Sequence, residues 1–190
     1  MKRLTCVDDF KVLRDLLHAQ RNDGAVTIVI PAGTCGIASG AGRLIQEAQR
    51  AILANHLAGR VRLRVTGCHG FCQREPSILV EPSRTFYPNV DPQDMERIVL
   101  AAAQGQVVHS LLLVDPSTGK RVERQDEIGF FANQVRGVLR ENENVDPTRI
   151  EDYIAHSGYG ALVQVLSRAD AGWVVEQIKI SQLRGRGGGG

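Results

Sequence analysis

Three of the four cysteines of this 190-residue chain lie in two glycine-containing loops, and this pattern constrains the fold more than any other feature. The first loop carries Cys35 after the β-branched run 26–30, and the second carries Cys68 and Cys72 after the run 61–65. Two neighbouring strands that end at one edge of a sheet would bring these loops together, so that the thiols could meet. The loop glycines allow tight turns and positive φ angles. They also leave backbone N–H groups free to face sulfur.

The sequence predicts a cytoplasmic location, peripheral to a membrane complex at most. Residues 1–6 lead into a charged helical pattern and lack the apolar core of a signal peptide. No apolar run approaches the roughly 20 residues that a bilayer-spanning helix needs, so we expect no direct membrane insertion. Clustered cysteines in a reducing compartment are more often metal ligands or catalytic groups than disulfides.

The composition argues against a nucleic-acid partner. The formal net charge is +2 and aromatic residues make up 5% of the chain, so neither a basic footprint nor a base-stacking surface is expected. The hydrophobic content of 43% is ordinary for a globular protein.

Residues 1–108 have the pattern of one α/β domain. Apolar residues recur at helical spacing in three segments, and four short runs are typical of strands. The expected helices are 7–21, 41–57 and 92–105, and the expected strands are 26–30, 61–65, 77–80 and 85–87. This order predicts a thioredoxin-like domain with a mixed sheet flanked by helices.

The remainder of the chain is expected to be different. The run 107–114 is strand-like, 109–127 contains the turn-rich linker, and 128–141 has helical spacing. Further helices are predicted from 146, over 159–166 and around 174–178. We therefore predict a domain at 1–108, a linker at 109–127 and a helical part at 128–190 that has no sheet to pack on.

The last residues, Gly185, Arg186, Gly187 and Gly188, have the composition of a phosphate-binding loop. Such loops work by placing a phosphate at the N-terminus of a following helix, and no helix follows here. We expect the chain to be the front piece of a longer protein. A flexible glycine tail is the alternative.

Four motifs, in this order, resemble the flavoprotein subunit of NADH dehydrogenases, and more narrowly the diaphorases of NAD(P)-reducing hydrogenases that carry a fused thioredoxin-like [2Fe–2S] ferredoxin domain. The motifs are GTCGIASGA at 33–41, GCHGFCQREP at 67–76, VDPTRIEDYIAHSGYGAL at 145–162 and SQLRGRGG at 181–188. Together they span most of the chain. The resemblance implies that residues 128–190 begin an FMN- and NADH-binding domain that is truncated here.

The resemblance also implies cofactors, partners and a role. Cys35, Cys68 and Cys72 would bind a [2Fe–2S] cluster, and Gly185, Arg186, Gly187 and Gly188 would begin the FMN loop. FMN, NAD(H) and a [4Fe–4S] cluster are implied for the part that follows. The chain would pass electrons between FMN and iron–sulfur centres as part of an NADH dehydrogenase, beside other iron–sulfur and hydrogenase or dehydrogenase subunits. This fragment alone would be inactive.

One departure from the family pattern leaves alternatives open. The four-cysteine version of the domain has a cysteine where this chain has Ile30, whereas a [2Fe–2S] cluster takes four ligands. The fourth ligand would be His69, Cys6, a water-derived ligand or a partner residue. The alternatives are a cluster-free docking module, a zinc site of Cys35, Cys68, His69 and Cys72, and a Cys68–Cys72 redox pair.

Overall fold

The computed structural model describes residues 3–21, 24–185 and 187. Its helices are α1 (Val7–Arg21), α2 (Thr34–Ala38), α3 (Ala41–Ala54), α4 (Met95–Ala103), α5 (Gly129–Ala132), α6 (Ile150–Ala155), α7 (Gly160–Arg168) and α8 (Ala171–Ser181). Its strands are β1 (Val26–Pro31), β2 (Val61–Thr66), β3 (Ile78–Glu81), β4 (Thr85–Tyr87), β5 (Leu113–Val114) and β6 (Arg121–Val122). Short 3₁₀ turns lie at η1 (Cys72–Arg74), η2 (Pro92–Asp94), η3 (His109–Leu111), η4 (Gln125–Glu127) and η5 (Arg140–Glu143).

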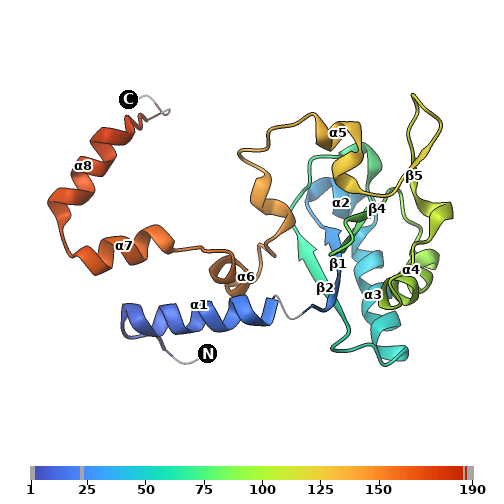
Figure 1. Ribbon diagram of the computed structural model, residues 1–190, viewed down its shortest axis with the longest axis horizontal. Coiled ribbons are helices and arrows are strands. Elements are labelled where there is room, and N and C mark those ends of the chain that lie inside the picture. The colour runs from blue at the N-terminus through green and yellow to red at the C-terminus, as the bar shows by residue number, and fades with distance from the viewer. Residues whose placement is uncertain (1–2, 22–23, 186, 188–190) are drawn as a thin grey trace.

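Four strands form a mixed sheet in the order β2-β1-β3-β4, and all four predicted strands are confirmed to within about one residue. β1 and β2 are parallel and pair without offset from Val26↔Val61 to Pro31↔Thr66. β3 is antiparallel to β1, and β4 is antiparallel to β3. Because β1 and β2 end together, the two segments that follow them leave the sheet at the same edge (Figure 1).

The main core lies between the sheet and helices α3 and α4. Ile28 and Ile30 of β1 are fully buried there, against Leu44 of α3 and Ile98 of α4. A parallel β-α-β unit joined to an antiparallel pair and a final helix is the thioredoxin-like arrangement, and it confirms the predicted fold class. Ile30, the position at which the resemblance implied a fourth cysteine, is a fully buried core residue in this chain.

The opposite face of the sheet is covered at β4 by residues 113–131. Phe86 packs with Leu113, Ile128 and Phe131, and its N–H donates to the carbonyl of Glu123 at 2.9 Å. The segment expected to be a linker, 109–127, therefore contributes a strand pair and buried side chains to this face. The boundary at residue 108 stays a prediction, and these contacts indicate how it can be tested.

Two expected elements are wrong in extent. Of the strand predicted over 107–114, only Leu113–Val114 forms, because the N–H of Val108 donates to the Tyr87 hydroxyl rather than to a neighbouring strand. The helix predicted over 128–141 ends at Ala132. Val135, which the helical pattern placed inward, is fully exposed, so no apolar face holds that helix together.

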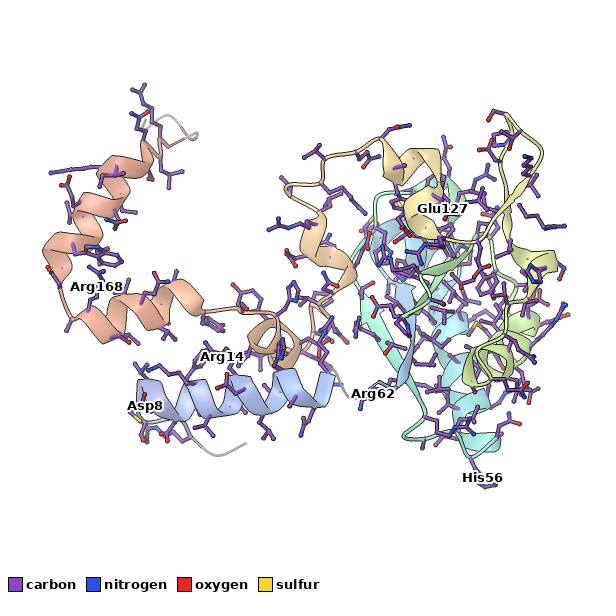
Figure 2. The ribbon with its side chains drawn as sticks, in the orientation of Figure 1. Asp8, Arg14, His56, Arg62, Glu127 and Arg168 are labelled. Carbon is purple, nitrogen blue, oxygen red and sulfur yellow. The ribbon has the colours of Figure 1, made fainter. Side chains whose placement is uncertain are left out.

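Helices α1, α6, α7 and α8 extend to one side of the sheet, and α1 runs beside α6 and α7 (Figure 1). The inner end of α1 is fixed where Arg62 donates to the carbonyl of Gln20 at 2.6 Å, while Asp8 marks the outer end (Figure 2). Neither α7 nor α8 contains a buried residue. Within the described residues, none of the helices is both long and apolar enough to cross a membrane.

We expect a chain ending at residue 108 to fold but to be less stable than one ending at residue 132. The shorter chain uncovers Phe86, which is 1% exposed in the full chain, and removes Phe130 and Phe131, two of the ring partners of Phe71. Burial of one or two aromatic side chains corresponds to about 2–5 kcal/mol of unfolding free energy. Urea denaturation of the two truncated chains measures this difference, and equal midpoints would show that residues 109–132 add nothing to the fold.

Candidate functional site

The two cysteine loops meet at the sheet edge where β1 and β2 end. The N–H of Ala32 extends the pairing by donating to the Thr66 carbonyl at 2.9 Å. Just beyond it, a Cβ placed on Gly33 would lie 2.9 Å from the Cβ of Cys68 and 3.2 Å from its nitrogen. Only glycine at position 33 lets the loops approach this closely, and this approach brings Cys68 near the helix that carries Cys35.

The first cysteine sits on a helix that is itself tightly fitted. Cys35 lies in α2, and a Cβ on Gly36 would lie 2.4 Å from the carbonyl oxygen of Pro31. The start of α2 is therefore packed directly on the end of β1. Because Cys35 is exposed, its thiol faces solvent at the same edge that the second loop reaches.

The three predicted ligands are brought together as free thiols. The Sγ atoms of Cys68 and Cys72 are 3.8 Å apart, and Cys35 and Cys72 are exposed while Cys68 is partly exposed. Hydrogen bonds to Cys35 and then to Cys68 raise the pKa of the Cys72 thiol to about 12. The Cys72 thiol thus contacts both other thiols at the surface, and metal binding would require deprotonated sulfurs.

A backbone donor faces one of the sulfurs. The N–H of Gly70 donates to the Sγ of Cys68 at 3.2 Å, and Gly70 has a φ of +91°. This left-handed conformation favours glycine, and it turns the N–H toward the thiol. Such donors stabilise negative charge on a ligating sulfur.

Residues 136–143 hold the second loop from outside the sheet. The Asn142 side chain donates to the Cys68 carbonyl at 3.1 Å, and the Arg136 guanidinium donates to the carbonyl of His69. Arg136 also pairs with Glu143, which in turn accepts from Arg84 at 3.0 Å. The sequence pattern gave no signal for these contacts, because they join residues about seventy positions apart.

Aromatic rings support the same loop. Phe71 stacks on Phe130 with ring centroids 4.2 Å apart and meets Phe131 edge-on at 5.5 Å. Phe86 of β4 packs behind them, 5.9 Å from Phe131. The turn between Cys68 and Cys72 is therefore anchored by an apolar side chain as well as by the Asn142 and Arg136 donors.

The structure does not bring His69 to the thiols as a ligand. Its ring is 1% exposed, and Nε2 shares a hydrogen bond with the Thr66 hydroxyl at 2.9 Å. Burial, followed by the charges of Arg136 and Arg84, lowers the pKa of His69 to about 3, so the ring is neutral. The expected role of His69 as a cluster or zinc ligand stays a prediction, while in this structure its ring is a buried anchor of the loop. The three-residue spacing of Thr66 and His69 is the signal for this pairing.

The other candidates lie elsewhere. Cys6 directly precedes α1, at its outer end near Asp8 and away from the sheet edge (Figure 2). Gly185 and Gly187 follow α8 and are likewise remote, while Arg186 and Gly188 lie outside the described residues. Within the described part of the chain, no three or more His, Cys, Asp or Glu side chains are arranged to hold a single metal ion.

Comparisons with known proteins give partial matches. The chain is 47% identical over 57 residues to the NADP-reducing hydrogenase subunit HndC of Solidesulfovibrio fructosivorans, covering 30% of this chain and 11% of that protein. It is 38% identical over 56 residues to a 2Fe–2S ferredoxin of Clostridium pasteurianum, covering 29% of this chain and 55% of the ferredoxin. No family model matches the chain.

Two solved structures of the thioredoxin-like [2Fe–2S] ferredoxin of Aquifex aeolicus also match. One has a TM-score of 0.44 at 20% identity, with 48% of this chain and 98% of that chain covered. The other has a TM-score of 0.42 at 19% identity and covers 52% and 98%.

Substitution of Gly33→Ala is expected to separate the two loops. The added Cβ would clash with Cys68, so the chain should lose about 1–3 kcal/mol of unfolding free energy. Gly42→Ala is the matched control, because a Cβ at position 42 meets nothing within 4 Å. Since Gly42 lies inside α3, this substitution should raise the unfolding free energy by about 0.5–1 kcal/mol. Urea denaturation compares the two variants, and similar stability for both would contradict the close approach at Gly33.

The buried His69 should make the protein less stable in mild acid. Its pKa is about 3 in the folded chain against 6.5 for the free side chain, so the unfolded chain binds the additional proton between these values. Stability contributed by neutral His69 is therefore complete above about pH 6.5 and is lost as the pH falls toward 3, with a slope of at most ~1.4 kcal/mol per pH unit. Urea denaturation between pH 7 and 4 should give a shallower pH dependence for His69→Gln, and parallel curves would refute this.

Proposed function

We propose that this chain is an electron-transfer component of an NAD(P)H-linked redox complex and that Cys35, Cys68 and Cys72 bind a [2Fe–2S] cluster. The observation that carries the proposal is the meeting of three free, solvent-accessible thiols at one sheet edge. The printed names of the two relatives, a hydrogenase subunit and a 2Fe–2S ferredoxin, support the same chemistry. Free thiols also fit the reducing cytoplasm proposed as its location.

The donor set fits a cluster in all but one ligand. Thiolates are the ligands that iron–sulfur clusters take, and the Cys72 thiol lies within hydrogen-bonding reach of both other thiols here. His69 is buried and Cys6 is distant, so we assign the fourth position to a solvent-derived ligand or to a side chain of a partner subunit. A bound cluster would supply a one-electron carrier.

The residues around the thiols would set the properties of that carrier. The Gly70 N–H withdraws negative charge from the Cys68 sulfur, and three thiolates carry less negative charge than four. Both effects would favour the reduced form of a bound cluster, and the smaller number of thiolates would raise its reduction potential relative to a four-cysteine site. The exposure of Cys35 and Cys72 leaves the site open to the redox centre of a partner.

The flavin and nicotinamide chemistry is assigned to other parts of the same complex, together with a [4Fe–4S] centre. In the described residues, Gly185 follows the C-terminal end of α8. That end of a helix carries partial negative charge and does not favour a phosphate. The chain alone is therefore expected not to oxidise NADH.

A cluster-free docking module is the second candidate, and the exposed apolar side chains of α7 and α8 favour it. Leu162, Leu166, Val175 and Ile178 are each at least 50% exposed. A partner subunit that covers these helices would remove this apolar surface from water.

Anaerobic reconstitution with ferrous iron and sulfide tests the choice. We expect the reduced protein to give an EPR signal that Cys72→Ser abolishes, because the substitution removes one of only three thiolates. Cys6→Ser is the matched control and should leave the signal unchanged, since that exposed cysteine lies far from the site. The absence of iron and sulfide in the anaerobic protein, or an unchanged signal in Cys72→Ser, would reject the cluster and favour the docking module.

A further inference from the structure

The second cysteine loop holds two thiols in contact within one short segment. The Sγ atoms of Cys68 and Cys72 are 3.8 Å apart, and a disulfide would bring them to about 2.05 Å. The turn between them contains Gly70 at a positive φ, so the backbone there already has the conformation that glycine tolerates best. A change of less than about 2 Å within one loop would therefore close the bond.

The surroundings of the loop hold these sulfurs near each other. Asn142 fixes the carbonyl of Cys68, while Phe71, between the two cysteines, is stacked on Phe130. These contacts lie on the backbone and on Phe71, so neither sulfur is used by them. The pair would be kept close in both its reduced and its oxidised form, and proximity is what makes an intramolecular disulfide favourable over two separate adducts.

We propose that Cys68 and Cys72 form a reversible disulfide whenever the chain carries no cluster and meets a small-molecule disulfide such as glutathione disulfide. Cys35 stays a free thiol in this reaction. The pair thus acts as a thiol-redox switch at the same edge of the sheet.

The two steps follow from exposure and distance. One thiol of the pair, as its thiolate, attacks one sulfur of glutathione disulfide, whose S–S bond breaks, and the released glutathione thiolate takes the proton that this cysteine gave up. The thiolate of the other cysteine, 3.8 Å away, then attacks the cysteine sulfur of the mixed disulfide and releases the second glutathione, which takes the proton of that second cysteine. Two cysteine thiols are oxidised, and one external disulfide is reduced to two thiols.

The consequence for the site rests on the proposed function. A Cys68–Cys72 disulfide withdraws two of the three thiolates proposed to bind the cluster. An oxidised chain would therefore accept iron and sulfide only after a thiol reductant had reopened the pair. Oxidising conditions would hold the chain in a protected form instead of allowing irreversible oxidation of the exposed thiols.

Mass spectrometry of the full chain tests the disulfide without any cluster. The chain is treated with a chelator and a reductant under anaerobic conditions, desalted, exposed to glutathione disulfide and alkylated with iodoacetamide. Trypsin releases both cysteines in one peptide, 65–74, and Cys35 in another, 22–43. We expect peptide 65–74 to lose two hydrogen atoms and remain unalkylated, while Cys35 and Cys6 are alkylated.

Three variants make the assignment specific. Cys35→Ser should form the same disulfide, whereas Cys68→Ser should leave Cys72 as a mixed disulfide with glutathione. Cys72→Ser should not form an intramolecular bond. A cross-link from Cys35 to either cysteine, or separate glutathione adducts on Cys68 and Cys72 in the unsubstituted chain, would overturn the proposal.

Reconstitution kinetics test the switch. We expect the oxidised chain to form the cluster at least ten times more slowly than the reduced chain, and dithiothreitol to restore the rate. Equal rates would contradict the claim that the disulfide controls cluster formation, although the Cys68–Cys72 disulfide itself would stand. If the reduced chain forms no cluster at all, the proposed function fails. The mass-spectrometric result then still decides whether Cys68 and Cys72 form a disulfide.

Discussion

The in-register pairing of β1 with β2 is the constraint on which the site depends. Pro31 and Thr66 are the last paired residues of the two strands, so the loops that follow them start side by side at the same end of the sheet. A register shift of one residue would turn every side chain of β2 to the opposite face and would move Cys68 along the strand. Burial of Ile28 and Ile30 under α3 and α4 fixes that register from the core side. Thus the burial of apolar side chains on one face of the sheet determines where the thiols meet.

The second determinant comes from outside the sheet. Glu143 pairs with both Arg84 and Arg136, and Arg136 in turn donates to the carbonyl of His69. The Asn142 side chain donates to the carbonyl of Cys68. Glu143 is shared between two guanidinium groups, so its partly buried charge is neutralised rather than left unpaired. The site is therefore built by the sheet on one side and by residues 136–143 on the other.

The sequence was sufficient for the sheet and for the meeting of Cys35, Cys68 and Cys72. Strand patterns are local, and the rule that neighbouring parallel strands end at one edge needs no knowledge of distant contacts. The same local reasoning failed at 128–141, where Val135 and Leu139 have helical spacing although no helix extends past Ala132. It also gave no indication that His69 is buried and that the charges of Arg136 and Arg84, which other parts of the chain contribute, lower its pKa. Patterns within one segment cannot reveal such partners, because their energies belong to the assembled fold.

The bonds from Arg136 and Asn142 link the thiol loop thermodynamically to the helices that follow η5. Their acceptors are the carbonyls of Cys68 and His69, so a ligand that reshapes this loop alters the same bonds that hold residues 136–143. Such linkage is reciprocal. If a ligand at the thiols stabilises the observed position of η5, then a partner that stabilises this position must increase the affinity of the thiols for the ligand by the same free energy. A subunit that docked so as to hold η5 in place would in this way change the affinity of a site that it never touches.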